Sequence, residues 1–125
     1  MEVKTIIVAD DDEKARLLIR DVLEDEGYQV IEAGEGGVAL QLALTHHPSL
    51  VILDLLMPVR NGYEVASILK EDPETADIPI LILTAMDIDQ GQQMAMGVGA
   101  DDYLLKPIFP SQIRAKVKAL LDQAS

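Results

Sequence analysis

The chain has 125 residues, which suits one domain with a hydrophobic core, and we expect residues 1–125 to fold as a single unit. A formal net charge of −12 disfavours binding to nucleic acid or to an anionic membrane, since both would repel so acidic a surface. There is no cysteine, which excludes disulfide and thiol chemistry, and no signal peptide or transmembrane stretch is visible, so the expected location is the cytoplasm.

The hydrophobic pattern predicts five strands that alternate with five helices. In chain order, apolar runs predict strands at residues 4–9, 28–33, 50–54, 78–83 and 102–105. Helical spacing predicts inner helix faces at Ala15, Leu18, Ile19 and Val22, at Val38, Ala39, Leu42 and Ala43, at Val65, Ile68 and Leu69, at Met94, Ala95 and Val98, and at Ile113, Val117, Leu120 and Leu121. Glycines around the fourth helix lower its propensity, so we expect it to be the least rigid. Strict alternation predicts an α/β fold, with a parallel sheet and helices on both faces.

The run Leu50–Pro58 is the most informative single stretch. It opens as an unbroken apolar run, which is typical of a strand buried on both faces of a parallel sheet. Pro58 has no amide hydrogen and cannot continue a central strand, so the strand must end before it. Asp54 therefore lies at the carboxyl tip of a buried strand, at the edge where α/β sheets bind their ligands.

Polar residues also follow the other predicted strands. Asp10 and Asp11 follow the first strand, Thr84 the fourth and Lys106 the fifth. In a doubly wound sheet the first and third strands are neighbours, so we expect their acidic tips to converge. Each residue alone has an ordinary alternative, because acids before a helix often cap it and a strand-end threonine or lysine is usually structural or surface-exposed. Their joint occurrence at matching strand ends favours a site.

The predicted group of carboxylates requires compensation of its charge. Carboxylates in one crevice repel each other, and a shared proton or a bound cation relieves the repulsion. Oxygen ligands without cysteine or histidine favour Mg²⁺ or Mn²⁺ over Zn²⁺. A carboxylate beside a metal, a lysine and a hydroxyl is suited to attack a phosphoryl group, and the product would be an aspartyl phosphate.

Four stretches of the sequence match one known family in order and spacing. They are Ile7–Asp12, Leu53–Pro58 with Gly62 after it, Leu83–Ala85 and Gly99–Pro107. On these stretches the whole chain resembles the receiver domain of bacterial two-component response regulators. The resemblance implies a doubly wound, flavodoxin-like (βα)5 fold with strand order 2-1-3-4-5, and a phosphoacceptor domain of a signalling phosphorelay.

The resemblance implies a role for each matching acid. Asp54 resembles the phosphoacceptor, and Asp10 and Asp11 resemble the acidic pair that holds magnesium, with Asp11 the more direct ligand. The main-chain carbonyl of Leu56 occupies the position of a further metal ligand. Asp12 falls at a variable position of the family, and we interpret it as a helix cap.

The resemblance also implies the switch and its partners. Thr84 and Lys106 resemble the switch hydroxyl and the phosphate-pairing lysine, and Tyr103 the aromatic residue that changes rotamer on activation. The implied phosphodonor is a histidine kinase or a phosphotransfer protein, and the implied output is a downstream effector protein or a fused domain. Phosphorylation would reshape the face of the fourth helix, fifth strand and fifth helix. The family catalyses only its own phosphorylation and dephosphorylation, so we do not expect an enzyme with a separate substrate.

Two departures from the family pattern predict particular behaviour. Leu56 and Met86 are apolar at positions that influence attack by water, which predicts a long-lived phosphoryl group. Gln92 and Gln112 replace one Lys–Glu pair of the charged network through which winged-helix regulators dimerise. We therefore expect a monomer or a weak dimer.

Three other functions fit the residues less well. A phosphohydrolase with an aspartyl-phosphate intermediate often holds an acid two residues after its nucleophile, where this chain has Leu56. A phosphorylation-independent interaction module on the same fold would not need the acids, Thr84 and Lys106 together. Flavin binding is disfavoured because acids occupy the first strand–helix loop, where a phosphate needs amides and hydroxyls.

Overall fold

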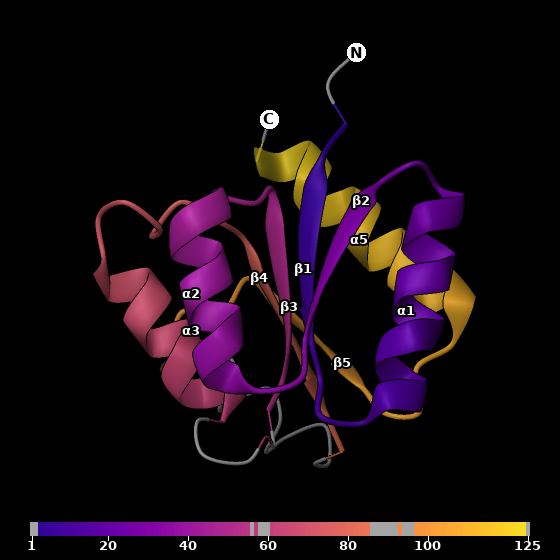
Figure 1. Ribbon diagram of the computed structural model, residues 1–125, viewed down its shortest axis with the longest axis horizontal. Coiled ribbons are helices and arrows are strands. Elements are labelled where there is room, and N and C mark those ends of the chain that lie inside the picture. The colour runs from indigo at the N-terminus through magenta and orange to yellow at the C-terminus, as the bar shows by residue number, and fades with distance from the viewer. Residues whose placement is uncertain (1–2, 56, 58–60, 86–92, 94–96, 125) are drawn as a thin grey trace.

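The computed structural model describes residues 3–55, 57, 61–85, 93 and 97–124 (Figure 1). The strands are β1 (Thr5–Ala9), β2 (Gln29–Ala33), β3 (Leu50–Asp54), β4 (Ile80–Thr84) and β5 (Asp102–Leu105). The helices assigned within these residues are α1 (Glu13–Asp25), α2 (Gly36–His46), α3 (Gly62–Glu71) and α5 (Pro110–Ala124). Met94 and Ala95, from the inner face predicted for the fourth helix, lie outside the described residues.

All neighbouring strands pair in parallel, in the order β2-β1-β3-β4-β5, which confirms the predicted doubly wound sheet. The strand order reverses between β1 and β3, which are direct neighbours. Figure 1 shows α1 and α5 on one face of the sheet and α2 and α3 on the other. We call the carboxyl ends of the strands the carboxyl edge and their opposite ends the amino edge. In this architecture ligands bind at the carboxyl edge, beside the point of reversal.

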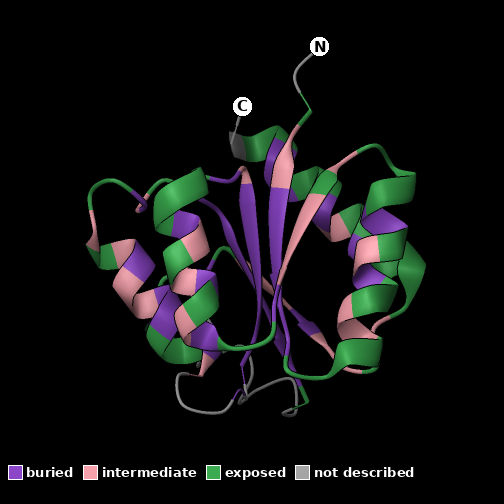
Figure 2. Ribbon diagram, viewed as in Figure 1, coloured by how far each residue is buried: buried purple, intermediate pink, exposed green. Residues whose placement is uncertain are grey.

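The inner strands are buried on both faces, as their apolar runs predict. Every residue of β3 and β4 is buried, and so are the last four residues of β1 (Figure 2). Alternate side chains enter two core clusters, one beneath α2 and α3 and one beneath α1 and α5. Because both faces are closely packed, a residue at the end of these strands has a rigid support.

Local signals set the helix ends near the carboxyl edge. The Asp12 carboxylate accepts a hydrogen bond from the Lys14 amide at 3.1 Å and caps α1, which confirms its interpretation as a cap. The Asn61 side chain accepts a hydrogen bond from the Glu64 amide at 2.9 Å and caps α3. Gly27 follows α1 with φ of 94°, a left-handed conformation that glycine adopts without strain.

The largest differences from the predicted elements concern the start of β4 and the exposure of two helix side chains. β4 begins at Ile80, two residues later than predicted, because Pro79 has no amide hydrogen to donate to the sheet. Leu18 and Val38 were predicted to face the core but are 43% and 42% exposed. The apolar residues of α1 and α2 extend around more of each helix than the sheet covers, so spacing alone could not select the buried stripe.

Candidate functional site

The carboxyl edge gathers the predicted polar residues at the ends of four strands. Asp10 follows β1, Asp54 ends β3, Thr84 ends β4 and Lys106 follows β5. Asp10, Asp54 and Thr84 are buried, whereas Lys106 is partly exposed. Buried carboxylates are costly unless they are paired or bind a cation, so two of them at one edge indicate a functional site.

Asp10, Asp11 and Asp54 form the acidic cluster that the strand ends predicted. One carboxylate oxygen from each lies within 4.8 Å of the others. Asp11 is exposed while the other two are buried, so the cluster opens to solvent on one side. The residues fit a hard divalent ion, because they offer only oxygen ligands and leave room for water. Leu56, predicted as a further ligand through its carbonyl, lies outside the described residues.

Lys106 lies between the two buried carboxylates. Its Nζ is 3.2 Å from Asp10 Oδ2 and 3.2 Å from Asp54 Oδ1. Desolvation lowers the pKa of the Lys106 ammonium, but the charges of Asp10 and Asp54 outweigh it and the pKa is raised. The structure thus places the Lys106 ammonium, with a raised pKa, against the predicted phosphoacceptor. The peptide bond between Lys106 and Pro107 is cis.

The ionised form of the Asp54 carboxyl group is disfavoured even though Lys106 lies beside it. Desolvation, and after it the Asp10 carboxylate, raise the pKa of the Asp54 carboxyl group from 3.8 to about 6, against the opposing effect of Lys106. One ammonium therefore does not balance the cluster. An added divalent cation would favour the ionised form of Asp54.

The remaining predicted residues lie around this cluster or outside the described part of the chain. Thr84 is fully buried, and its main-chain carbonyl accepts a hydrogen bond from the Lys106 amide at 2.7 Å. Tyr103, in the middle of β5, is half-buried and packs against the core cluster beneath α2 and α3. Met86 and Gln92 lie outside the described residues.

The sequence did not reveal how closely Gly62 packs on the site. Gly62 is the first residue of α3, and a Cβ atom there would clash with the main-chain oxygen of Asp54. In the sequence, Gly62 was noted only as part of a stretch that matches the receiver family. A glycine required by close approach and one required by a turn look the same in a single sequence.

The sequence also gave no sign that Arg16 contacts the site. Its Nη1 donates a hydrogen bond to the main-chain carbonyl of Asp10 at 2.7 Å, and its Nε donates to Glu32 at 2.9 Å. An arginine on a helix is usually a surface residue. The only available signal was a spacing of six residues from Asp10, which is too common to indicate a contact.

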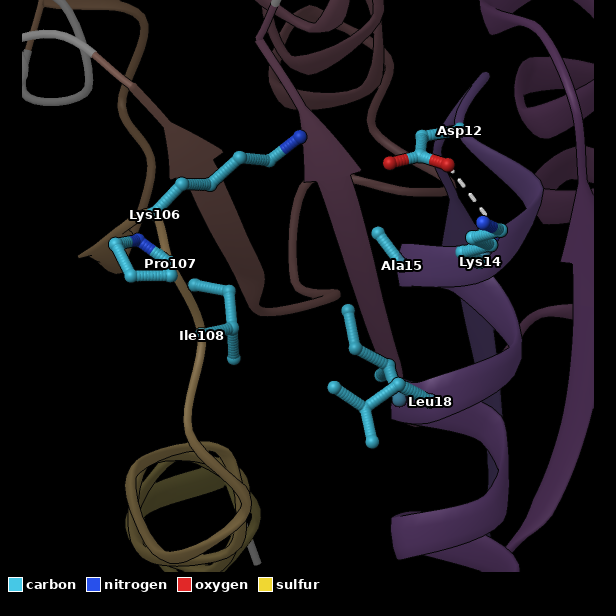
Figure 3. Close-up of a pocket in the computed structure, with 8 residues that line it drawn as sticks. Asp12, Lys14, Ala15, Leu18, Lys106, Pro107 and Ile108 are labelled. Atoms are coloured by element: carbon cyan, nitrogen blue, oxygen red, sulfur yellow. Dashed lines mark hydrogen bonds between the residues drawn. The ribbon is translucent and has the colours of Figure 1, made fainter.

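A groove of about 330 Å³ lies beside the site, between α1 and the segment that follows β5 (Figure 3). Figure 3 shows Ala15 and Leu18 of α1 on one side and Pro107 and Ile108 on the other. Lys106 also lines the groove, so the apolar surface adjoins the acidic cluster.

Fold and site together define an α/β domain whose acidic crevice, with one lysine, lies beside the point of strand reversal. Residues 6–118 match the family model of the response regulator receiver domain, and the chain belongs to this family. This confirms the resemblance inferred from the sequence motifs. Among the described residues, no helix combines the length and the apolar character needed to cross a membrane.

Relatives and solved structures agree with the family. The chain is 41% identical over 118 residues to the alkaline phosphatase synthesis transcriptional regulatory protein PhoP of Bacillus subtilis, a match that covers 94% of this chain and 48% of PhoP. It is 39% identical to the phosphate regulon transcriptional regulatory protein PhoB of Pseudomonas aeruginosa, over 94% of this chain and 52% of PhoB. A response-regulator structure from Chloroflexus aurantiacus superposes with a TM-score of 0.92 at 34% identity, over 97% of this chain and 99% of that one. The chain thus spans about half the length of the curated relatives it matches.

Proposed function

We propose that this receiver domain accepts a phosphoryl group on Asp54 in a reaction that requires Mg²⁺ or Mn²⁺. The observation that carries the proposal is the convergence of three carboxylates and the Lys106 ammonium at the carboxyl edge. Asp54 suits the role of nucleophile because it ends a fully buried strand, between the acids that follow β1 and the lysine that follows β5.

The residues of the chain divide the chemistry among them. A carboxylate oxygen of Asp54 attacks the phosphorus of a phosphohistidine, so that an O–P bond forms while the N–P bond breaks and its electron pair returns to the imidazole. The carboxylates of the acidic cluster would hold a divalent ion, whose positive charge would offset the charge of the phosphoryl oxygens. Lys106 and the Thr84 hydroxyl donate hydrogen bonds to those oxygens.

The same contacts supply a switch. Lys106 pairs with Asp10 and Asp54, and a phosphoryl group on Asp54 would compete for its ammonium. Thr84 ends β4 and Lys106 follows β5, so new contacts to both act on the strands beside the predicted output face. We expect Tyr103 to change rotamer and that face, with α5 and the predicted fourth helix, to bind an effector or a fused domain. The relatives are named as transcriptional regulators, which supports a signalling output rather than turnover of a separate substrate.

A protein phosphodonor, a histidine kinase or a phosphotransfer protein, must bring its phosphohistidine to Asp54 past the carboxyl edge. The groove beside Lys106 offers it an apolar contact surface, since Leu18 is 43% exposed there. Buried apolar contacts at the centre of an interface contribute most of its affinity. The groove therefore supports docking of the donor against α1 and the segment after β5.

The direct test is the intact mass of the protein after incubation with acetyl phosphate and Mg²⁺. We expect one added phosphoryl group in the parent chain, none in Asp54→Asn, and none in the parent with EDTA. The matched control is Asp101→Asn, which removes a carboxylate at the amino edge and should be labelled like the parent. Absence of labelling, under conditions where a known receiver domain is labelled, would favour the phosphorylation-independent interaction module.

The decay of the labelled protein tests the expected lifetime of the phosphoryl group. Leu56 and Met86 are both apolar, so neither orients a water molecule by hydrogen bonding. The double variant Leu56→Asn, Met86→Glu should lose the group faster than the parent. An unchanged rate of loss would refute the role given to these two positions.

A further inference from the structure

The main chain between the two acids that follow β1 is held by an arginine. The Asp10 carbonyl that accepts the Arg16 hydrogen bond at 2.7 Å belongs to the peptide group that joins Asp10 to Asp11. A peptide group is planar, so a hydrogen bond to its carbonyl restrains the backbone rotations on either side, ψ of Asp10 and φ of Asp11. Arg16 therefore restrains the main chain that carries two of the three carboxylates of the cluster.

Asp10 is restrained at every polar atom. Its amide donates to Ala33 of β2 at 3.1 Å, and its Oδ1 accepts the Asp12 amide at 2.9 Å. Its Oδ2 pairs with Lys106, and its carbonyl pairs with Arg16. The Arg16 contact is the one that fixes the peptide joining Asp10 to its exposed neighbour in the cluster.

Glu32 in turn holds Arg16 in place. Arg16 Nε donates to Glu32 Oε1 at 2.9 Å, and Arg20 Nη1 donates to Glu32 Oε2 at 2.7 Å. Glu32 lies on β2 opposite Val8 of β1, so its position is fixed by the sheet. The guanidinium is a rigid planar fork, and here its Nε donates to Glu32 while its Nη1 donates to the Asp10 carbonyl.

We propose that Arg16, held by Glu32, is a positioning residue that orients the Asp10–Asp11 peptide for binding of the divalent ion. The inference rests on the proposed metal-dependent function and adds to it a residue outside the set that touches metal or phosphate. Outer partners of metal ligands commonly change metal affinity by about 10- to 100-fold when they are removed.

The sign of the effect separates positioning from simple electrostatics. Removing a cation near an acidic cluster should tighten Mg²⁺ binding, because the ion then meets less repulsion. Loss of orientation should weaken Mg²⁺ binding instead. Arg20 provides the matched control, because it shares Glu32 and also pairs with Glu24 at 2.9 Å, whereas the hydrogen bond to the Asp10 carbonyl comes from Arg16.

The experiment is a Mg²⁺ titration of the parent, Arg16→Met, Arg16→Lys and Arg20→Met, followed by backbone amide NMR shifts. We expect the dissociation constant to rise about tenfold in Arg16→Met and nearly as much in Arg16→Lys, which keeps the charge but loses the fork. Arg20→Met should bind Mg²⁺ as tightly as the parent or more tightly. In metal-free spectra the Asp11 amide should shift in both Arg16 variants and not in Arg20→Met.

The outcomes distinguish failure of the positioning role of Arg16 from failure of the proposed metal-dependent function. Unchanged or tighter Mg²⁺ binding in the Arg16 variants overturns the positioning role, and so does equal weakening in Arg20→Met. If Arg16→Met does not fold, Arg16→Lys and Glu32→Gln give the same test, and parent-like binding in both overturns the role. A parent chain that binds no Mg²⁺ refutes the proposed function itself, which distinguishes that failure from failure of this inference.

Discussion

The two edges of the sheet each hold a lysine among acceptors, but only one of these clusters is balanced. At the amino edge, Lys70 Nζ donates to the carbonyls of Ala76 and Ile78 and to Asp101 Oδ2, at 3.2, 2.9 and 3.0 Å. An ammonium has three donors, and all three are used. Asp101 also accepts the amide of Ile80 at 2.8 Å, so this cluster joins α3, β4 and β5 with one positive and one negative charge.

At the carboxyl edge the charges do not cancel. Lys106 faces Asp10 and Asp54, and Asp11 completes the acidic cluster. Desolvation, and after it repulsion from Asp10, raise the pKa of Asp54 even with Lys106 beside it. The comparison teaches that a lysine beside an acid is not by itself a functional signal. What marks the site is negative charge that the protein leaves for a cation to offset.

Replacement of each lysine by methionine should give the largest difference between the edges, in labelling rate and in stability. Lys106→Met should slow labelling by acetyl phosphate about a hundredfold, because it removes a donor to the developing phosphoryl charge. Lys70→Met should keep the labelling rate and lower the free energy of unfolding by roughly 2–3 kcal/mol, since it leaves two carbonyls and a carboxylate without their partner. Labelling rates at saturating Mg²⁺ and urea unfolding measure both, and equal loss of rate in the two variants would break the comparison.

Removal of one acid should have opposite effects on stability at the two edges. The pKa of Asp54 is raised to about 6 in the folded protein, so its stabilising protonation is complete below about pH 4 and is lost as the pH rises through about 6. At pH 7.5 without metal, Asp54→Asn should therefore raise the free energy of unfolding, by about 2–3 kcal/mol. Asp101→Asn should lower it.

Urea unfolding with EDTA and with saturating Mg²⁺ measures this second prediction. The advantage of Asp54→Asn should shrink when Mg²⁺ is present, because the metal stabilises only chains that bind it well. A variant less stable than the parent at pH 7.5 in EDTA would show that the carboxyl edge is already balanced.

A substitution at the contact between α3 and β3 should lower the free energy of unfolding by less than the preceding variants change it. Gly62→Ala places a Cβ atom against the Asp54 carbonyl, where main chain must shift, and should cost about 1–3 kcal/mol. Gly97→Ala is the control, because a Cβ atom there would meet nothing within 4 Å. Thermal unfolding compares them, and an equal effect of the two substitutions would contradict the close contact at the site.

A substitution in the groove beside the carboxyl edge should slow transfer from a protein phosphodonor without affecting labelling by a small one. Leu18→Glu should slow transfer from a phosphotransfer protein that labels the parent by about tenfold, as expected for loss of one buried apolar contact. Labelling by acetyl phosphate should be unchanged, since a small donor does not use the groove. Val38→Glu, equally exposed on α2, is the control. Unchanged transfer in Leu18→Glu would remove the groove from the docking surface.

Much of this molecule could be predicted from the sequence because its signals are local. The apolar runs of β3 and β4 predicted a parallel sheet, and the proline after β3 and the strand-end acids predicted the edge that carries the site. The strand order followed from the resemblance to the receiver family. The cap at Asp12 was recognisable for the same reason, since a cap depends on a few adjacent residues.

The rest depends on contacts between distant segments. Arg16 meets Asp10 and Glu32 only after β1 and β2 pair, and Gly62 meets Asp54 only after α3 packs on β3. The exposure of Leu18 depends on where the segment after β5 lies across the groove. None of these distances is encoded by spacing along one element, so periodicity could not supply them.

The most direct test of the unbalanced carboxyl edge is the pH titration of the Asp54 carboxyl carbon by NMR, with Asp54→Asn to assign the signal. In EDTA we expect a midpoint near pH 6, and with saturating Mg²⁺ a midpoint at least about one unit lower, because the cation favours the ionised carboxylate. A midpoint near pH 4 in both conditions, about that of an ordinary aspartate, would contradict the account.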